Sequence, residues 1–184
     1  ILVWDYTIRF SNLLAPFPNL RILQPNIQFV WKNNVSALFE QGNIQSGGEM
    51  APLRAYLITK MLWNPQIDSK KIENEFLNRY YGPAAQYIKQ YIHLLHDHNQ
   101  TGKEIKMSIF GNPVQDKETF LTTSLIAQYN AIFDKAVQSV KHSPELLDRV
   151  QSARLPVYYA MLELARHTKT GERGAFITEA DGTL

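Results

Sequence analysis

The stretch Ile1-Leu-Val-Trp-Asp-Tyr-Thr-Ile-Arg-Phe10 decides the fold, because it has the composition of a strand that needs cover on both faces. The other good strand candidate is Val35-Ser-Ala-Leu-Phe-Glu40. Two strands alone do not make a stable parallel sheet, and the sequence begins without an initiator Met. We therefore expect the chain to be the C-terminal piece of a larger protein, with part of its chemistry lying upstream.

Helical patterns follow both predicted strands. After the first strand, residues 19–24 form a short predicted turn, and Pro25 suits the first position of a helix that ends near Asn33. After the second strand, a polar, glycine-bearing loop leads into an amphipathic helix over residues 50–63. The order strand, helix, strand, helix predicts a parallel sheet with right-handed crossovers, as in the last two βα units of a (β/α)8 (TIM) barrel.

Only helical patterns follow residue 65. A long helix over residues 68–99 is predicted to break or kink at Tyr81-Gly-Pro83, Asp116 is predicted to cap a second helix, and Ser143-Pro144 to open a third. Three helices that each carry an apolar face and are joined by short links predict an antiparallel three-helix bundle. The fold class is therefore α/β followed by all-α. The predicted domains are the barrel end at 1–65, the helical bundle at 66–167 and an irregular tail at 168–184.

The composition excludes several classes of protein. Apolar residues at 45% and charged residues at 20% are typical of an ordered globular chain. No apolar run approaches the roughly 18 residues of a membrane span, and a net charge of +2 from scattered Lys and Arg does not indicate nucleic-acid binding. The absence of cysteine excludes disulfides, thiolate metal sites and a cysteine nucleophile.

Polar and aromatic residues gather at the predicted carboxyl ends of both strands, where a parallel barrel places its active site. A sugar pocket needs flat aromatic faces against ring C–H groups, and amide or carboxylate partners for hydroxyls. Trp4, Tyr6, Glu40, Gln41 and Asn43 would supply such a substrate-binding site. The alternative is that both aromatic residues fill the barrel interior and that Glu40 is a capping or ion-paired carboxylate.

Other candidate residues have structural interpretations. Glu49 stands at the start of a helix, where the helix dipole favours a carboxylate, so a structural role is expected. His93, His96 and His98 lie near the end of the long helix, and we interpret them as a solvated helix end. No ligand spacing indicates a metal site, and Gly47-Gly48 is too weak a motif for a phosphate-binding cofactor. No metal and no cofactor is therefore predicted.

Several strings in the sequence resemble a known family. They are Val3-Trp-Asp-Tyr6, Asn33-Asn-Val-Ser-Ala-Leu-Phe-Glu-Gln-Gly42, the helix ending Leu62-Trp-Asn-Pro65, and Tyr80-Tyr-Gly-Pro-Ala-Ala85. They are similar to a bacterial group first catalogued as a domain of unknown function and later linked to glycoside hydrolase family 163. Members of that family are endo-β-N-acetylglucosaminidases acting on N-glycans. The resemblance covers roughly residues 1–95.

The resemblance implies a (β/α)8 catalytic domain with a helical domain packed behind it. Acid catalysis would come from a carboxylate on a middle strand upstream of Ile1, and the substrate's own N-acetyl group would act as nucleophile. No catalytic residue is therefore assigned in this chain, and the five predicted site residues would shape the sugar pocket. The implied partners are a glycan substrate and the upstream part of the same barrel. The implied location is secreted, periplasmic or on the cell surface of a bacterium.

Two alternatives remain open at this point. One is a non-catalytic carbohydrate-binding or scaffold module, in which a degenerate barrel lacks the acid. The other is a helical interaction domain with a β-rich N-terminal arm. This second alternative predicts that residues 1–10 run antiparallel to residues 35–40, whereas a barrel requires the two strands to be parallel and adjacent.

Overall fold

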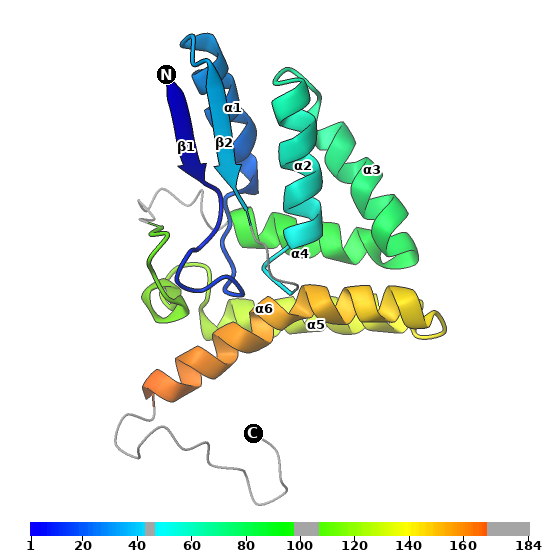
Figure 1. Cartoon of the computed structure of the whole chain (residues 1–184). Coiled ribbons are helices and arrows are strands. Elements are labelled where there is room, and N and C mark those ends of the chain that lie inside the picture. The colour runs from blue at the N-terminus through cyan, green and yellow to red at the C-terminus, as the bar shows by residue number, and fades with distance from the viewer. Residues whose placement is uncertain (43–46, 98–106, 169–184) are drawn as a thin grey trace, which may run out of the picture.

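A computed structural model describes residues 1–42, 47–97 and 107–168 of the chain. The structure is mainly helical, with a single two-stranded sheet in the described part (Figure 1). In chain order the elements are β1 (Leu2–Tyr6), α1 (Leu20–Lys32), β2 (Ala37–Gln41), α2 (Ala51–Trp63), α3 (Ser69–Tyr81), the 3-10 helix η1 (Gly82–Ala84), α4 (Ala85–Asp97), the 3-10 helix η3 (Pro113–Asp116), α5 (Thr123–Val140) and α6 (Pro144–Thr168).

The two strands are parallel neighbours, with Leu2 opposite Ala37 at one end and Tyr6 opposite Gln41 at the other. This confirms the predicted strand–helix–strand–helix order, and the prediction of an antiparallel N-terminal arm is wrong. The first strand is shorter than predicted. Beyond Tyr6, the backbone N–H and the hydroxyl of Thr7 both donate to the Gln41 carbonyl. Ile8 and Arg9 follow outside the sheet and are buried.

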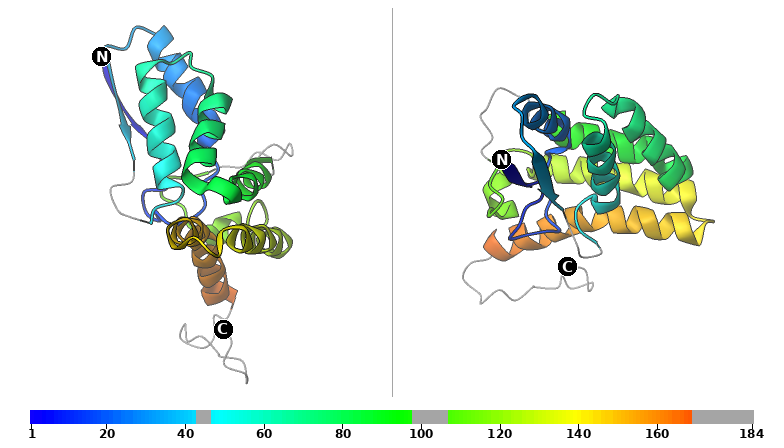
Figure 2. Two further views of the ribbon diagram at one scale, coloured as in Figure 1. Left: turned by 90° about the vertical axis from the view of Figure 1, so that its right-hand side faces the viewer. Right: turned by 45° about the horizontal axis from the view of Figure 1, so that its top comes forward.

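Helices α1 and α2 lie on the same side of the sheet (Figure 2). Leu38 faces them and packs against the core, whereas Leu2, Trp4 and Phe39 are at least half exposed. Because side chains alternate along a strand, one face of the sheet is covered by helices and the other is open. Strands of a parallel sheet are normally covered on both faces.

One hydrophobic core runs through the described helices from α1 to α6. Its largest fully buried aromatic side chains are Tyr91, Phe120, Tyr129 and Phe133. This core continues across residue 65, and the division into domains 1–65 and 66–167 stays a prediction. The predicted tail lies outside the described residues, except for Thr168 at the end of α6.

The predicted long helix is broken into α3 and α4, as its Tyr81-Gly-Pro83 sequence indicated. Gly82 has a φ of +53°, in the left-handed region that favours glycine, and η1 separates the two helices. Asp68 caps α3 by accepting from the Lys71 backbone N–H. The three predicted helices are consequently four, and α4 packs against α5 and α5 against α6.

Two predicted helix starts are wrong. The turn and helix expected on either side of Pro25 are one helix, α1, with Pro25 inside it. Asp116 does not cap α5, because Thr122 does so by accepting from the Leu125 N–H at 3.3 Å. Asp116 instead forms a buried ion pair with Arg9. The predicted start of α6 at Pro144 is confirmed.

No helix in the described ranges is long and apolar enough to cross a membrane.

Candidate functional site

Three of the predicted site residues lie together on the open face of the sheet. Trp4 and Tyr6 are two residues apart on β1 and are 59% and 41% exposed. The Trp4 Nε1–H donates to Gln41 Oε1 at 2.8 Å across the strand pair. Phe39, directly opposite Trp4, meets it edge-on with ring centroids 4.8 Å apart. Trp4 is thus held by a hydrogen bond and a ring contact while its surface remains accessible.

The aromatic surface continues beyond the carboxyl end of β1. The Tyr6 ring meets Phe10 at a centroid distance of 5.9 Å, and Phe10 meets Phe110 at 6.2 Å. We call Phe39, Trp4, Tyr6, Phe10 and Phe110 the aromatic row; Phe10 and Phe110 are 46% and 70% exposed. Sequence reasoning missed three of these residues. Phe39 could have been found from its alternation with Gln41, whereas no local signal predicts that Phe110 joins them.

Glu40 lies apart from this surface. It pairs in register with Asp5, so both carboxylates project from the face opposite to Trp4, Tyr6 and Gln41. Burial raises the pKa of Glu40 to about 7, and the neighbouring Asp5 carboxylate adds to the rise. The structure therefore does not bring Glu40 together with the aromatic residues. Asn43, the fifth predicted site residue, lies outside the described residues.

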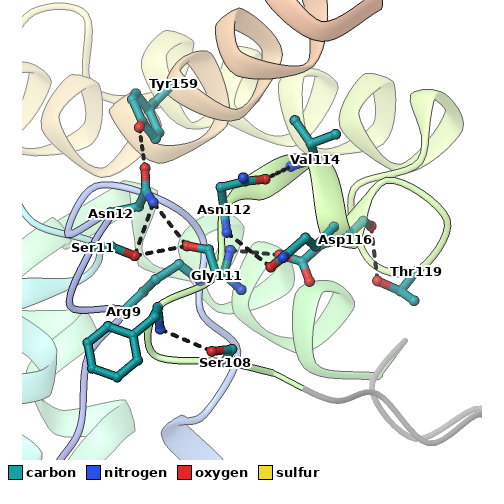
Figure 3. Close-up of polar contacts among 12 residues, drawn as sticks. Arg9, Ser11, Asn12, Ser108, Gly111, Asn112, Val114, Asp116, Thr119 and Tyr159 are labelled. Carbon is teal, nitrogen blue, oxygen red and sulfur yellow. Dashed lines mark hydrogen bonds and ion pairs between the residues drawn. The ribbon is translucent and has the colours of Figure 1, made fainter.

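A polar network fixes the loop that carries Phe10 to the segment that carries Phe110 (Figure 3). The Ser11 backbone N–H donates to the Ile109 carbonyl at 3.3 Å, and Asn12 Nδ2 donates to the Gly111 carbonyl at 2.9 Å. The Tyr159 hydroxyl, from α6, donates to Asn12 Oδ1 at 2.5 Å. The helical part of the chain thereby sets the position of one end of the aromatic row.

Residues 1–93 match the model of a family described as Domain of unknown function (DUF4838). The chain belongs to this family. The matched segment includes both strands and ends within α4, so Phe110 and Tyr159 lie outside it. No curated protein and no solved structure matches the chain.

A buried ionic cluster joins the two βα units of the DUF4838 segment. Arg54 of α2 is 2% exposed and donates to Glu49 Oε2 at 2.5 Å, to the Thr7 carbonyl at 3.0 Å, and to Asn19 Oδ1. Burial raises the pKa of Glu49, against the lowering effect of Arg54. Glu49 is therefore a structural partner of Arg54, in agreement with the structural role expected for it.

The interpretation of the histidines as a solvated helix end is wrong for His96. Its side chain is buried, its Nε2 accepts the Leu20 N–H at 3.1 Å, and its Nδ1 lies 2.8 Å from the Ile92 carbonyl. This arrangement requires the neutral tautomer with hydrogen on Nδ1. His96 of α4 therefore satisfies a backbone donor at the start of α1. His93 is exposed, and His98 lies outside the described residues. The described residues contain no group of three potential ligands that could hold a metal ion.

We expect His96 to make stability fall on acidification. Burial lowers its pKa from 6.5 to about 4, so between these values the unfolded chain binds the proton and the folded chain does not. The free energy of unfolding should therefore decrease as pH falls through this window, by about 2 kcal/mol between about pH 7 and about pH 5. Urea unfolding of the wild type and of His96→Gln at both pH values measures this contribution as the difference in pH dependence.

His142→Gln is the matched control, because that side chain is exposed between α5 and α6 and is not among the groups that shift the pKa of His96. It should keep the wild-type pH dependence. An identical pH dependence in the wild type and in His96→Gln would contradict the role given to His96.

Proposed function

We propose that this chain is the C-terminal part of a glycoside hydrolase that cleaves β-linked N-acetylglucosamine-containing glycans, such as N-glycans. In this proposal the two βα units belong to a (β/α)8 barrel whose other strands lie upstream. The parent enzyme would be secreted, periplasmic or on the surface of a bacterial cell. The observation that carries the proposal is the exposed aromatic row, which runs from the middle of two adjacent parallel strands past the carboxyl end of β1.

The aromatic row has the chemistry of a sugar-binding surface. A pyranose ring presents C–H groups on its faces and hydroxyls around its edge. An exposed indole such as that of Trp4 offers a flat apolar surface to such a ring face. Gln41 Oε1 holds the indole N–H, and the Gln41 amide nitrogen makes no hydrogen bond with the described residues. That amide is left to donate to a sugar hydroxyl.

Unpartnered apolar surfaces support an upstream continuation of the barrel. Leu2, Trp4 and Phe39 expose the uncovered face of the sheet, where the remaining strands of a barrel would close around an interior. Ile22 and Phe29, seven residues apart on one stripe of α1, are 47% and 68% exposed. In a barrel this stripe would pack against the preceding helix of the outer ring.

The open face in the described residues carries no carboxylate: its residues are Leu2, Trp4 and Tyr6 on β1 and Ala37, Phe39 and Gln41 on β2. The catalytic acid would therefore lie on the upstream strands. The nucleophile is the substrate's N-acetyl group, in substrate-assisted hydrolysis with retention. The same observation favours a second candidate, a non-catalytic carbohydrate-binding module, which differs only in lacking the upstream acid.

We expect Trp4→Ala in the intact protein to slow the release of an N-glycan by about 5-fold to 150-fold. This range corresponds to losing about 1–3 kcal/mol of stacking and hydrogen bonding in the transition state. The measurement is kcat/KM on a glycan carrying the chitobiose core, followed by mass spectrometry of the products. The thermal unfolding midpoint should barely change, because Trp4 is 59% exposed.

Trp63→Ala is the control matched in residue type, since Trp63 is 91% exposed at the end of α2 and should retain the wild-type rate. If Trp4→Ala also hydrolyses the glycan at the wild-type rate, the aromatic row does not bind substrate. If the intact protein binds the glycan without hydrolysing it, the protein is the non-catalytic carbohydrate-binding module and not a hydrolase.

A further inference from the structure

A concave site lies among α1, α2, α3 and α4, and it shares no residue with the aromatic row. Its cavity of about 520 Å³ is within the size range of small-molecule sites. Leu20, Leu57 and Met61 supply apolar lining. The polar lining comes from α1, α3 and α4: Arg21, Gln24, Ser69, Lys70, Glu73, Asn74, Lys89 and His93.

Basic side chains outnumber acidic ones around this cavity. Arg21, Lys70, Lys89 and His93 line it from three different helices, against one carboxylate, Glu73. The Lys89 ammonium donates to Asn74 Oδ1 at 2.7 Å, which fixes its position between α4 and α3. Lys89 has no carboxylate partner among the described residues, so its charge remains available to a ligand.

Glu73 does not neutralise these basic groups by direct contact. Burial raises its pKa, while the charges of His93, Lys89 and Arg21 lower it, so all three act on the carboxylate. None of the three forms an ion pair with Glu73 in the described structure, and Arg21 pairs instead with the exposed Asp97 at 2.8 Å. The basic groups and the Glu73 carboxylate therefore line the same cavity without forming an ion pair across it.

We propose that this cavity binds a small molecule of about monosaccharide size that carries an oxyanion, either a carboxylate or a phosphate or sulfate group. Lys70, Lys89 and Arg21 would bind the oxyanion through charge-assisted hydrogen bonds. Glu73 and Asn74 would accept and donate hydrogen bonds with hydroxyl groups. The apolar side chains would lie against the body of the ligand. This inference does not rest on the proposed glycan hydrolysis.

The arrangement differs from ordinary solvated lysines in two respects. Its charges converge on a concavity from separate helices, and the concavity has an apolar lining. Arg21, Lys70 and His93 are exposed and Lys89 is half-buried, so a ligand seated against the apolar lining is removed from water on that side only. Charge-assisted contacts on the apolar side of the cavity are stronger than on an open surface. Diffuse attraction of ions to surface lysines would be screened at physiological salt, whereas binding in the cavity should persist.

The test is titration of the chain with glucose 6-phosphate, glucuronate, inorganic sulfate and neutral glucose at constant ionic strength. Binding is followed by backbone amide NMR shifts and by calorimetry. At least one of the two sugar anions should bind saturably and shift amides in α3 and α4, while glucose should not. Lys89→Met and Lys70→Met should each weaken that binding by about tenfold or more, the loss of one charge-assisted hydrogen bond.

Lys71→Met is the matched control, because Lys71 neighbours Lys70 on α3 and is exposed but does not line the cavity. It should bind like the wild type. The responses to glucuronate and to glucose 6-phosphate show whether a carboxylate or a phosphate is preferred. The inference is overturned if no anion binds saturably, if glucose binds equally well, or if Lys71→Met loses as much affinity as Lys89→Met.

Discussion

Arg54→Met is expected to lower the free energy of unfolding by about 3–5 kcal/mol, the usual cost of removing one partner of a buried ion pair. Arg54 is the shared donor for Glu49, the Thr7 carbonyl and Asn19. These acceptors lie at the start of α2, in the loop after β1 and at the start of α1. The variant leaves the buried Glu49 carboxylate and Asn19 Oδ1 without their Arg54 donor, and Met cannot replace these hydrogen bonds. The Thr7 carbonyl loses Arg54 but still accepts from Asn19 Nδ2 at 2.9 Å.

Equilibrium urea unfolding measures this loss. Arg79→Met is the control, because Arg79 is an exposed arginine 3.4 Å from Glu75 on α3, and it should change stability by less than about 0.5 kcal/mol. The double variant Arg54→Met/Glu49→Leu should recover part of the loss, since it removes the unpaired buried charge. If Arg54→Met lowers the free energy of unfolding by less than about 1 kcal/mol, the buried ionic cluster does not stabilise the fold to the extent expected.

The pH dependence of Arg54→Met provides a second readout. Arg54 is the main group that lowers the pKa of Glu49 against the effect of burial. The pKa of Glu49 is already raised by burial in the wild type, and without Arg54 it should rise further in the folded state. The folded variant is then stabilised as pH falls, so its deficit relative to the wild type should be smaller at about pH 5 than at about pH 8.

The elements that the sequence predicted best are those set by local signals. The parallel strand pair followed from two β-branched and aromatic stretches separated by a helical pattern, and the break at Tyr81-Gly-Pro83 followed from glycine and proline chemistry. The failures are long-range contacts. His96 caps a helix that begins 76 residues earlier, and Asp116 pairs with an arginine 107 residues away. The spacing of apolar residues along the chain does not indicate contacts between residues so far apart.

The site was predicted only in part, because local rules placed some of its residues and long-range packing placed the others. Trp4 and Tyr6 were placed on one face because strand side chains alternate. The same rule applied to Glu40 and Gln41 shows that two consecutive residues cannot share a face, so the separation of Glu40 was readable from the sequence. Phe110 was not, because its place beside Phe10 depends on the packing of the segment after residue 107 against the loop after β1.

Asp116→Ala is the other variant expected to have a large effect, again about 3–5 kcal/mol. Asp116 Oδ2 accepts from Arg9 Nη1 at 2.7 Å, and both residues are almost completely buried. Arg9 also lies over the Phe17 ring, 5.3 Å from its centroid. Truncating the carboxylate leaves a guanidinium charge in the interior. Arginine does not deprotonate in proteins, so this charge cannot be removed by a shift in pKa.

The double variant Arg9→Met/Asp116→Leu should be more stable than Asp116→Ala, because the apolar pair leaves no buried charge. Lys117→Ala, next to Asp116 and exposed, is the control and should resemble the wild type. Amide hydrogen exchange adds a spatial readout, with protection lost first around η3 in Asp116→Ala. Since η3 and the segment carrying Phe110 adjoin in sequence, loosening them should also disorder one end of the aromatic row. Unchanged protection around η3, together with a stability loss under about 1 kcal/mol, would show that the hydrogen bonds of Ser11 and Asn12 hold this segment without the ion pair.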